Sequence, residues 1–363
     1  MLRNSSSRAC FLVLLAIGLA GATLWAAAPP PVDIPARGSL PRAVEQQVQQ
    51  RMEYWLDQLR DAKDEDGIRQ ATKALLADYY KSENLSYRYI YAAQMAAKAP
   101  GYLAGMTDSI RQINLAVSVS GIDQVSIQPA LGIMVGHANP AVRYLGWHGY
   151  RSIRMLALAQ GPSFARKMQD SLAKRAVGEQ SGPVVGEIFL MLTLPPIEIP
   201  GVSEQTLRDT RREFLQITRS TWPKRCRQVL AGDASITEAC RSAVIALNSF
   251  GQAYADDEAQ RKTILQMAID LAYCSAKAYD TAKGAGDLGS ANQELLRDIE
   301  NLLNNVKGTQ NAYLVTALTD PNVLPPRGVA VRRAVVENWL DALESDGVVK
   351  PEFKEQPKPR LIQ

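Results

Sequence analysis

Apolar side chains recur every three or four residues along almost the whole chain. The first clear example is a stripe of five apolar residues with Gln, Arg and Glu between them: Val44, Val48, Met52, Leu56 and Leu59. This is the period of one face of an α-helix, whereas a half-buried strand alternates apolar and polar residues. No segment shows a convincing alternation of that kind. The pattern therefore predicts an all-α fold built from helices joined by short turns.

The same spacing places helices along the rest of the chain. Before residue 200 it predicts helices near 71–79, 85–97, 103–119, 127–136, 140–159, 163–176 and 184–194, and after it near 204–230, 236–254, 258–282, 291–306, 311–318 and 331–343. The proline-rich segment 195–200 separates the two sets, because proline lacks an amide hydrogen and clashes with the preceding turn. We expect one region over residues 39–200, a region of longer helices over 201–345 and a flexible tail over 346–363, which is rich in proline and charge.

The first residues indicate export. Arg3 and Arg8 precede a short apolar run at residues 11–19, and small residues follow up to Ala22. This is the composition of a signal peptide over residues 1–22, followed by a proline-rich leader over 23–38. The alternative is a retained membrane anchor, but the run is shorter than the roughly 20 apolar residues that a spanning helix needs. We therefore expect a periplasmic or extracellular protein with no membrane span after cleavage.

The charge balance argues against nucleic acid as a partner. The formal net charge of the whole chain is +4, and removal of Arg3 and Arg8 with the signal peptide lowers it to +2. Nucleic-acid-binding domains carry a strong basic patch, which a charge this small does not indicate.

One segment is more specific than the general helical pattern. Residues 139–150 read Asn-Pro-Ala-Val-Arg-Tyr-Leu-Gly-Trp-His-Gly-Tyr. Asn139 is suited to cap a helix, Pro140 to occupy its first turn, and Gly146 to allow a close helix approach. The segment resembles the second helix of a HEAT repeat, in which Asp-Pro, Val-Arg, a small residue and Leu recur. The resemblance implies a right-handed α-solenoid of helical hairpins, HEAT-like or armadillo-like, over residues 39–200.

The resemblance also implies roles for particular side chains. The family's arginine, here Arg143, pairs between repeats in a ladder. Solenoids bind partners along a groove lined by successive repeats, and Trp, Tyr and Arg are enriched in binding hot spots. The candidate binding surface therefore comprises Arg143, Trp147, His148, Tyr150, Arg151 and Arg154. The alternative for Trp147 is packing into the neighbouring helix. The longer helices of 201–345 either continue the stack or form a separate bundle.

A second candidate surface lies in the helix predicted at 204–230. Its C-terminal half carries four cations without acidic neighbours: Arg219, Lys224, Arg225 and Arg227. They could bind an anionic partner. The alternative is a solvated face, where cations are favoured by the negative end of the helix dipole.

Three cysteines follow the predicted signal peptide: Cys226, Cys240 and Cys274. Their spacing fits no zinc or haem motif. Cys226 and Cys240 flank a turn predicted at 231–234, so antiparallel helices would bring them to similar heights. In an oxidising compartment this predicts a Cys226–Cys240 disulfide. The alternative is buried free thiols, because free cysteine is among the most buried residue types.

Catalytic motifs are poorly represented. The chain has only two histidines, His137 and His148. Residues 284–289 fit G-x-G-x-x-G, but a dinucleotide site requires a preceding strand, so an interhelical loop is the better interpretation. The acidic run 256–258 fits a helix start. We therefore expect a non-catalytic envelope or secreted scaffold that binds a protein partner and needs no cofactor. The alternative is an α/α-toroid hydrolase or lyase, which would need a carboxylate pair to act on an envelope glycan.

Overall fold

The computed structural model describes residues 29–161, 172–195, 198–282, 284, 286–322 and 327–351. Within these ranges every regular element is a helix and none is a strand. The prediction of an all-α fold is confirmed. None of the helices in these ranges combines the length and the apolar character needed to cross a membrane.

The helices of the first half are α2 (Arg42–Asp61), α3 (Glu65–Tyr80), α4 (Leu85–Gly105), α5 (Ser109–Ser120), the 3-10 helix η1 (Val125–Ile127), α6 (Gln128–Met134), α7 (Pro140–Ala159) and α9 (Gly182–Leu192). Residues 172–178 are also helical. The second half contains α10 (Glu204–Leu230), α11 (Ala234–Ala253), α12 (Glu258–Thr281), α13 (Gly286–Lys307), α14 (Tyr313–Thr319), α15 (Arg327–Arg333), the π-helix η2 (Ala334–Leu340) and α16 (Asp341–Glu344).

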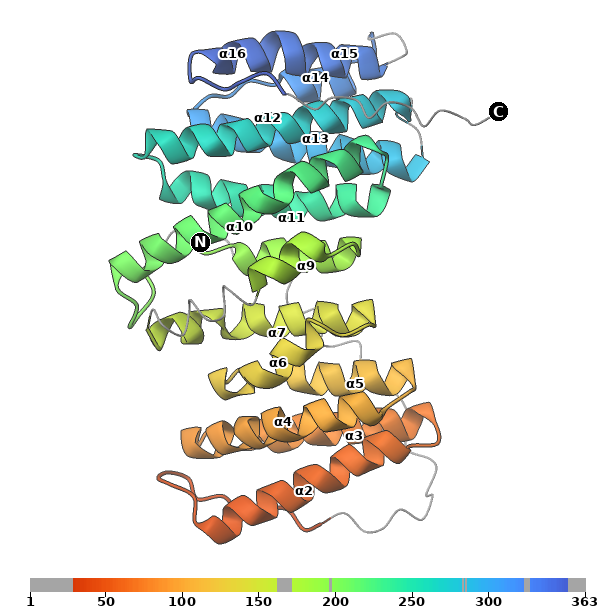
Figure 1. Cartoon of the computed structure of the whole chain (residues 1–363), viewed down its shortest axis with the longest axis vertical. Coiled ribbons are helices and arrows are strands. Elements are labelled where there is room, and N and C mark those ends of the chain that lie inside the picture. The colour runs from red at the N-terminus through yellow and green to blue at the C-terminus, as the bar shows by residue number, and fades with distance from the viewer. Residues whose placement is uncertain are drawn as a thin grey trace.

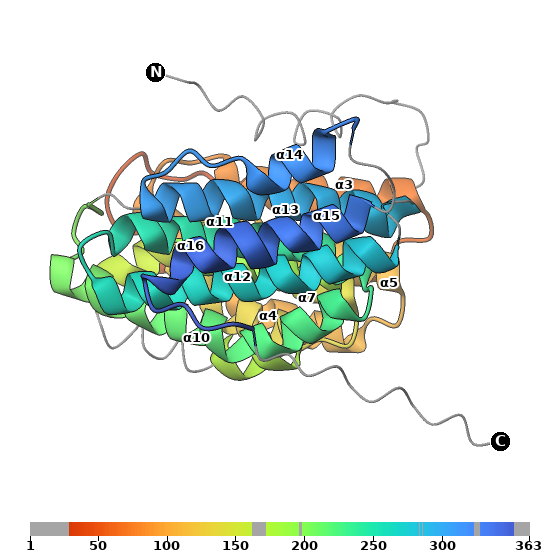
Figure 2. The same cartoon turned by 90° about the horizontal axis from the view of Figure 1, so that it is seen from above.

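The helices are stacked along the longest axis of the molecule, with α2 at one end and α16 at the other (Figure 1). One column contains α3, α5, α7, α9, α11 and α13, and each member packs on the next. The opposite column contains α2, α4 and α6, then α10, α12 and α15. The chain alternates between the columns, so consecutive helices such as α2 and α3 or α12 and α13 form packed pairs. Seen from above, helices of successive layers follow a common direction (Figure 2).

The apolar core continues past the boundary expected at residues 195–200. α9 packs closely on α11, and also contacts α10. Leu192, Leu194, Ile199 and Leu207 are buried members of one hydrophobic cluster that runs from Val32 to Val348. The described part of the prolyl segment therefore connects two helix layers without interrupting the packing between them.

The bounds of α7 and α10 coincide with the predicted bounds, and each helix starts directly after a residue whose side chain caps it. Asn139 Oδ1 accepts a hydrogen bond from Ala141 N at 2.9 Å, and Ser203 Oγ accepts one from Thr206 N at 3.1 Å. Each satisfies an amide that the first turn leaves unpaired.

The prediction of one helix over residues 103–119 is wrong. α4 runs through Pro100 to Gly105, and α5 starts only at Ser109. The proline removes one backbone hydrogen bond, but the buried Ala99 and Leu103 on either side anchor α4 to the core. The break comes instead at Asp108, whose carboxylate caps the first amides of α5.

Extended segments cover both ends of the stack. At the start, Lys81 Nζ donates to Val32 O at 3.0 Å and Asn84 Nδ2 donates to Pro35 O at 2.8 Å, while Val32 and Leu40 are buried. The described part of the proline-rich leader is therefore packed. The predicted signal peptide, residues 1–22, lies outside the described residues.

The first residues of the expected flexible tail are also packed. Val348 is buried, and Val349 exchanges two hydrogen bonds with the amide of Gln266, at 2.6 and 2.8 Å. Lys307 pairs with Asp346 at 2.6 Å. This part of the tail is fixed because it satisfies polar groups of α12 and α13, whereas residues 352–363 lie outside the described part.

Candidate functional site

α7 meets α9 and the residues before it along a polar seam. Arg143, Arg151 and Arg154 are spaced so that they share one side of α7. Opposite them stand two carboxylates with little exposure, Glu179 and Glu187. We call these five residues and His148 the α7–α9 seam. It contains four of the six residues in the surface predicted from the HEAT resemblance.

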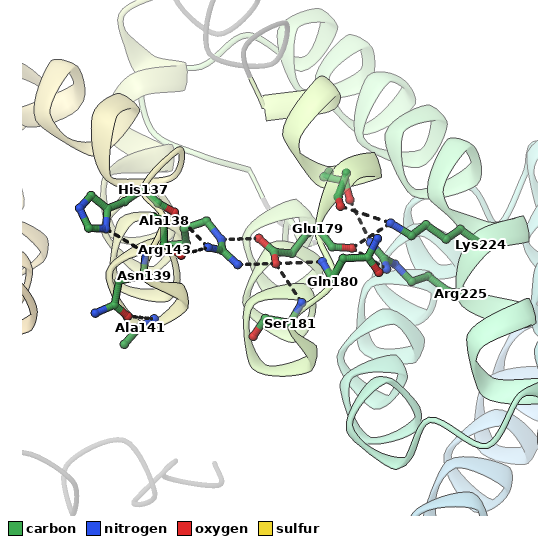
Figure 3. A network of polar contacts seen from close by, with 12 residues as sticks. His137, Ala138, Asn139, Ala141, Arg143, Glu179, Gln180, Ser181, Lys224 and Arg225 are labelled. Carbon is green, nitrogen blue, oxygen red and sulfur yellow. Dashed lines mark hydrogen bonds and ion pairs between the residues drawn. The ribbon is translucent and has the colours of Figure 1, made fainter. Parts of the chain in front are cut away.

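Arg143 forms the first contact of the seam (Figure 3). Its Nε and Nη2 donate to the two carboxylate oxygens of Glu179 at 2.8 and 2.9 Å. Its Nη1 also donates to the carbonyls of His137 and Ala138, at 3.0 and 2.8 Å. Arg143 therefore ties the turn before α7 to the turn before α9, as a planar fork of donors allows.

Glu179 is held by backbone groups as well. Its Oε1 accepts hydrogen bonds from the amides of Gln180 and Ser181, both at 2.9 Å. Burial alone would raise the pKa of this carboxyl group, but the hydrogen bonds from Arg143, Ser181 and Gln180 outweigh burial and lower it. Glu179 is thus an ionised carboxylate that holds the turn leading into α9.

His137 supports the same turn. Its Nδ1 accepts a hydrogen bond from Asn139 N at 3.1 Å. Burial, and secondarily the charge of Arg143, lower the pKa of the imidazole. A neutral ring is the form that can accept this bond, so His137 has a structural role in the turn.

Lys224 and Arg225 reach the backbone around Glu179 from the other side (Figure 3). Arg225 donates to Ala176 O and Glu179 O, each at 3.0 Å, and Lys224 donates to Val177 O and Glu179 O, each at 3.1 Å. Both cations therefore cap the C-terminal carbonyls of the helix at 172–178, which is the favourable end for positive charge.

This geometry corrects the predicted anionic-partner patch. Arg225 is only 1% exposed and cannot meet a partner. Lys224 is half-buried and is engaged by backbone carbonyls. Of the four predicted cations, only Arg219 and Arg227 are exposed.

The centre of the seam joins an imidazole, a guanidinium and a buried carboxylate. Glu187 is 2% exposed, and its Oε1 lies 2.8 Å from Arg151 Nε and 3.2 Å from His148 Nδ1. Arg151 Nη2 lies 3.0 Å from the same imidazole nitrogen. Because guanidinium only donates, His148 Nδ1 either accepts from Arg151 or carries a proton and donates to Glu187. Two side chains of α7, each about one-third exposed, therefore meet one buried carboxylate of α9.

Arg154 closes the seam at the far end of α9. Its Nη1 donates to Leu190 O at 2.8 Å. Burial, more than the nearby Arg151, lowers the pKa of Arg154 to about 10. Like Lys224 and Arg225, Arg154 caps a helix C-terminus.

Trp147 and Tyr150, both predicted to lie on the binding surface, are core residues. They are 1% and 2% exposed, and their rings lie 6.5 Å apart between α7 and its neighbours. The close approach of α6 explains their burial, because a Cβ added at Gly146 would lie only 2.9 Å from Val135 N. The alternative interpretation of Trp147 as a packed side chain is therefore correct.

The exposed side of α7 carries a different set of residues. The chain has Tyr144, His148, Ser152 and Leu156 at intervals of four along α7. Tyr144, Ser152 and Leu156 are exposed, and 36% of the His148 side chain is exposed. We call them the α7 stripe. The rings of Tyr144 and His148 are stacked with their centroids 6.3 Å apart. Sequence reasoning missed Tyr144 and Leu156, although counting in fours from His148 would have identified both.

A hollow of about 410 Å³ lies between the starts of α11 and α13. Its lining residues are Ala234, Ser235, Glu238, Asp287, Ser290, Ala291 and Glu294. Two of its carboxylates, Glu238 and Glu294, lie 3.3 and 3.8 Å from the guanidinium of Arg241. No aromatic ring is among the lining residues, so this hollow offers no platform on which a sugar would stack.

The predicted loop and cap interpretations of other motifs agree with the described residues. Gly284 and Gly286 have φ values of 67° and 66° in the connection between α12 and α13, which is a helix–helix turn. Asp257 caps α12 by accepting a hydrogen bond from Gln260 N at 3.1 Å.

The expected Cys226–Cys240 disulfide is absent, since all three described cysteines are free and buried. Burial, and secondarily the neighbouring Cys274, raise the pKa of the Cys226 thiol well above its usual range. The helices that carry the three cysteines, α10, α11 and α12, all pack on one another.

Two results bear on what the seam and the stripe can do. Within the described ranges, no group of three or more His, Cys, Asp and Glu side chains could hold a metal ion. No protein-family model, curated protein or solved structure matches the chain.

Proposed function

We propose that this protein is a non-catalytic binding scaffold: an exported HEAT-like solenoid of helical hairpins whose α7 stripe contacts a protein partner. The observation that carries the proposal is the α7 stripe itself. It presents an aromatic ring, an imidazole and a leucine to solvent from a helix that is packed on both sides. A rigid helix lowers the conformational entropy lost when such side chains bind.

The arrangement of the helices supports the solenoid. Two columns, alternately supplied by successive helices, are the expected result of stacking one hairpin on the next. Gly146 permits close packing of α6 and α7, and Arg143 links neighbouring layers through Glu179. Both are roles that the HEAT resemblance implies for these two residues.

The alternative function is an α/α-toroid hydrolase or lyase. A toroid encloses its site within a ring of helices, whereas α2 and α16 lie at opposite ends of an open stack (Figure 1). The hollow between α11 and α13 has carboxylates, but Glu238 and Glu294 share Arg241 and no ring lines it. These features favour the scaffold.

Affinity capture from an envelope extract tests the proposal, with the chain lacking residues 1–22 as bait. A Tyr144→Ser/Leu156→Ser variant removes the apolar groups of the stripe. Ile245→Ser is the matched control, because Ile245 is 54% exposed on α11, away from α7. We expect one protein to be retained by the wild-type and control baits and lost with the double variant.

Two results would contradict the proposal. Equal retention by all three baits would place the contact elsewhere. Cleavage of an envelope polysaccharide by the bait, without capture of a protein, would favour the hydrolase or lyase.

A further inference from the structure

α4 exposes apolar residues along most of its length. In its first half, Leu85 and Tyr89 are 73% and 59% exposed. In its second half, Ala97, Gly101 and Ala104 are exposed as well. We call these five residues the α4 face. Single exposed apolar residues are ordinary, but a row of them along one helix marks a contact surface.

No charge interrupts the α4 face. α4 contains only two charged residues, and each is paired with a carboxylate: Arg88 with Glu83 at 3.0 Å. Lys98 pairs with Glu53 of α2 at 2.5 Å. α6, which packs beside α4, has no charged residue and exposes 52% of Ile133. An apolar partner could therefore cover the α4 face without desolvating an unpaired charge.

Two glycines near the end of α4 pack against no described neighbour. Glycine weakens a helix relative to alanine, and it is useful where another backbone or side chain approaches closely. A Cβ added at Gly101 or Gly105 would meet no atom within 4 Å, whereas a Cβ at Gly146 of α7 would lie 2.9 Å from Val135 N. The space beside the second half of α4 is therefore open to a side chain from another molecule.

We propose that the α4 face pairs with the same face of a second copy of this chain, antiparallel and about a two-fold axis. The first half of the face carries the large side chains of Leu85 and Tyr89, and the second half carries only small residues. In an antiparallel pair, the large half of one copy meets the small half of the other, and the same contact is made twice. In a parallel pair, the two large halves would collide. The α4 face is thus complementary in shape to its own copy.

The size of the α4 face sets the strength of the pair. A helix of 21 residues is about 30 Å long and about 10 Å wide, so one side of it covers about 300 Å². Stable interfaces bury about 800 Å² on each partner. The pair is therefore reversible, with a dissociation constant in the micromolar range or weaker. Because α7 belongs to the other column, the α7 stripe of each copy stays outside this interface.

Sedimentation velocity of the chain lacking residues 1–22 tests the pairing. Concentrations from about 5 µM to about 500 µM cover the affinity expected for an interface of this size. We expect the sedimentation coefficient to rise with concentration from the value of a monomer toward that of a dimer. A chain that is still a monomer at the highest concentration, or that forms a larger oligomer, would overturn the proposal.

Gly101→Gln separates the pairing from the fold. Because the space beside Gly101 is open, a longer side chain fits the single chain but blocks the approach of a second copy. We expect dimerisation to be at least about tenfold weaker, and the thermal midpoint to equal or exceed that of the wild type, since Gln favours a helix more than Gly does. Ala77→Gln is the matched control, because Ala77 is exposed on α3 in the other column, and it should dimerise like the wild type.

Tyr89→Ser tests the other half of the α4 face. Loss of the large side chain should also weaken dimerisation at least about tenfold. Wild-type dimerisation in Tyr89→Ser or in Gly101→Gln would contradict the pairing. A lower thermal midpoint in Gly101→Gln would contradict it too, because the glycine would then serve the packing of the single chain.

Discussion

α7 and α10 each carry a row of cationic side chains, and the two rows meet at Glu179 from opposite sides (Figure 3). On α7, Arg143 and Arg151 face carboxylates and keep part of their surface in solvent. On α10, Lys224 and Arg225 face only backbone carbonyls and a glutamine amide, and Arg225 is sealed from solvent. The side chains are of one kind, but their partners differ.

The difference shows how a basic helix in a stack divides its charges between packing and binding. Carbonyls at a helix C-terminus have no intrahelical donor, so a cation that satisfies them becomes part of the fold. A cation opposite a buried carboxylate completes an ion pair and can still present its other edge to solvent. We therefore expect loss of the sealed Arg225 on α10 to weaken the fold more than substitutions along the α7–α9 seam, and the α7 stripe to matter least for stability.

Arg225→Met should have the largest effect. It keeps much of the side-chain volume but leaves the buried carbonyls of Ala176 and Glu179 without this donor. We expect the free energy of unfolding to fall by about 3 kcal/mol, because Ala176 O loses its side-chain donor, Glu179 O keeps only Lys224, and two charge-assisted hydrogen bonds are lost. Urea unfolding followed by circular dichroism measures it. Lys224→Met is the control, with a loss of about 1 kcal/mol because Lys224 is partly exposed. Equal losses in the two variants would show that the buried Arg225 stabilises the fold no more than the partly exposed Lys224.

Glu179→Gln should have the next largest effect, because it removes the charge that both regions surround. We expect a loss of about 2 kcal/mol at pH 7, typical of charge-assisted hydrogen bonds. The folded pKa of Glu179 lies below its unfolded value, so its contribution is present above the unfolded pKa and is lost as pH falls through the folded pKa. The difference between wild type and variant should therefore shrink between pH 5 and pH 3, two conditions at which urea unfolding is compared. A constant difference would show that the carboxylate charge is not what matters.

Glu187→Gln should lower the free energy of unfolding less than Arg225→Met or Glu179→Gln does. Arg151 and His148 are about one-third exposed, at 31% and 36%, so water can solvate them when the carboxylate is neutralised. We expect a loss of about 1 kcal/mol. A double-mutant cycle with Arg151→Gln measures the pair directly, and a coupling energy above about 0.5 kcal/mol is expected for residues in contact. Zero coupling would show that Arg151 and Glu187 do not stabilise each other, contrary to the contact described for the seam.

The sequence was sufficient for the features that depend on local chemistry. The all-α fold follows from a period that each helix repeats, and the starts of α7 and α10 follow from Asn139 and Ser203, whose caps act within three residues. Gly146 and the helix-start role of Asp257 were predictable for the same reason.

The features that depend on the stacking of layers were not predictable. Whether Trp147 faces solvent depends on α6, and whether Arg225 faces solvent depends on the helix at 172–178. The surroundings of Cys226 depend on α12, whose Cys274 lies 48 positions later in the sequence. Periodicity gives the face of a helix, but it does not say which neighbour covers that face. The sequence therefore predicted the helices α7 and α10, but not which of their side chains the neighbouring helices cover.

The α7 stripe gives the smallest expected change in stability and so the sharpest contrast with α10. Tyr144→Ser and Leu156→Ser remove side chains that are 36% and 47% exposed. Surface substitutions of this kind change the free energy of unfolding by about 0.5 kcal/mol or less. The stacking of Tyr144 on His148 places its variant at the upper end of that range. Thermal unfolding of each variant beside Arg225→Met checks the order. A loss from Leu156→Ser as large as that from Arg225→Met would mean that Leu156 belongs to the core and not to a surface that a partner can contact.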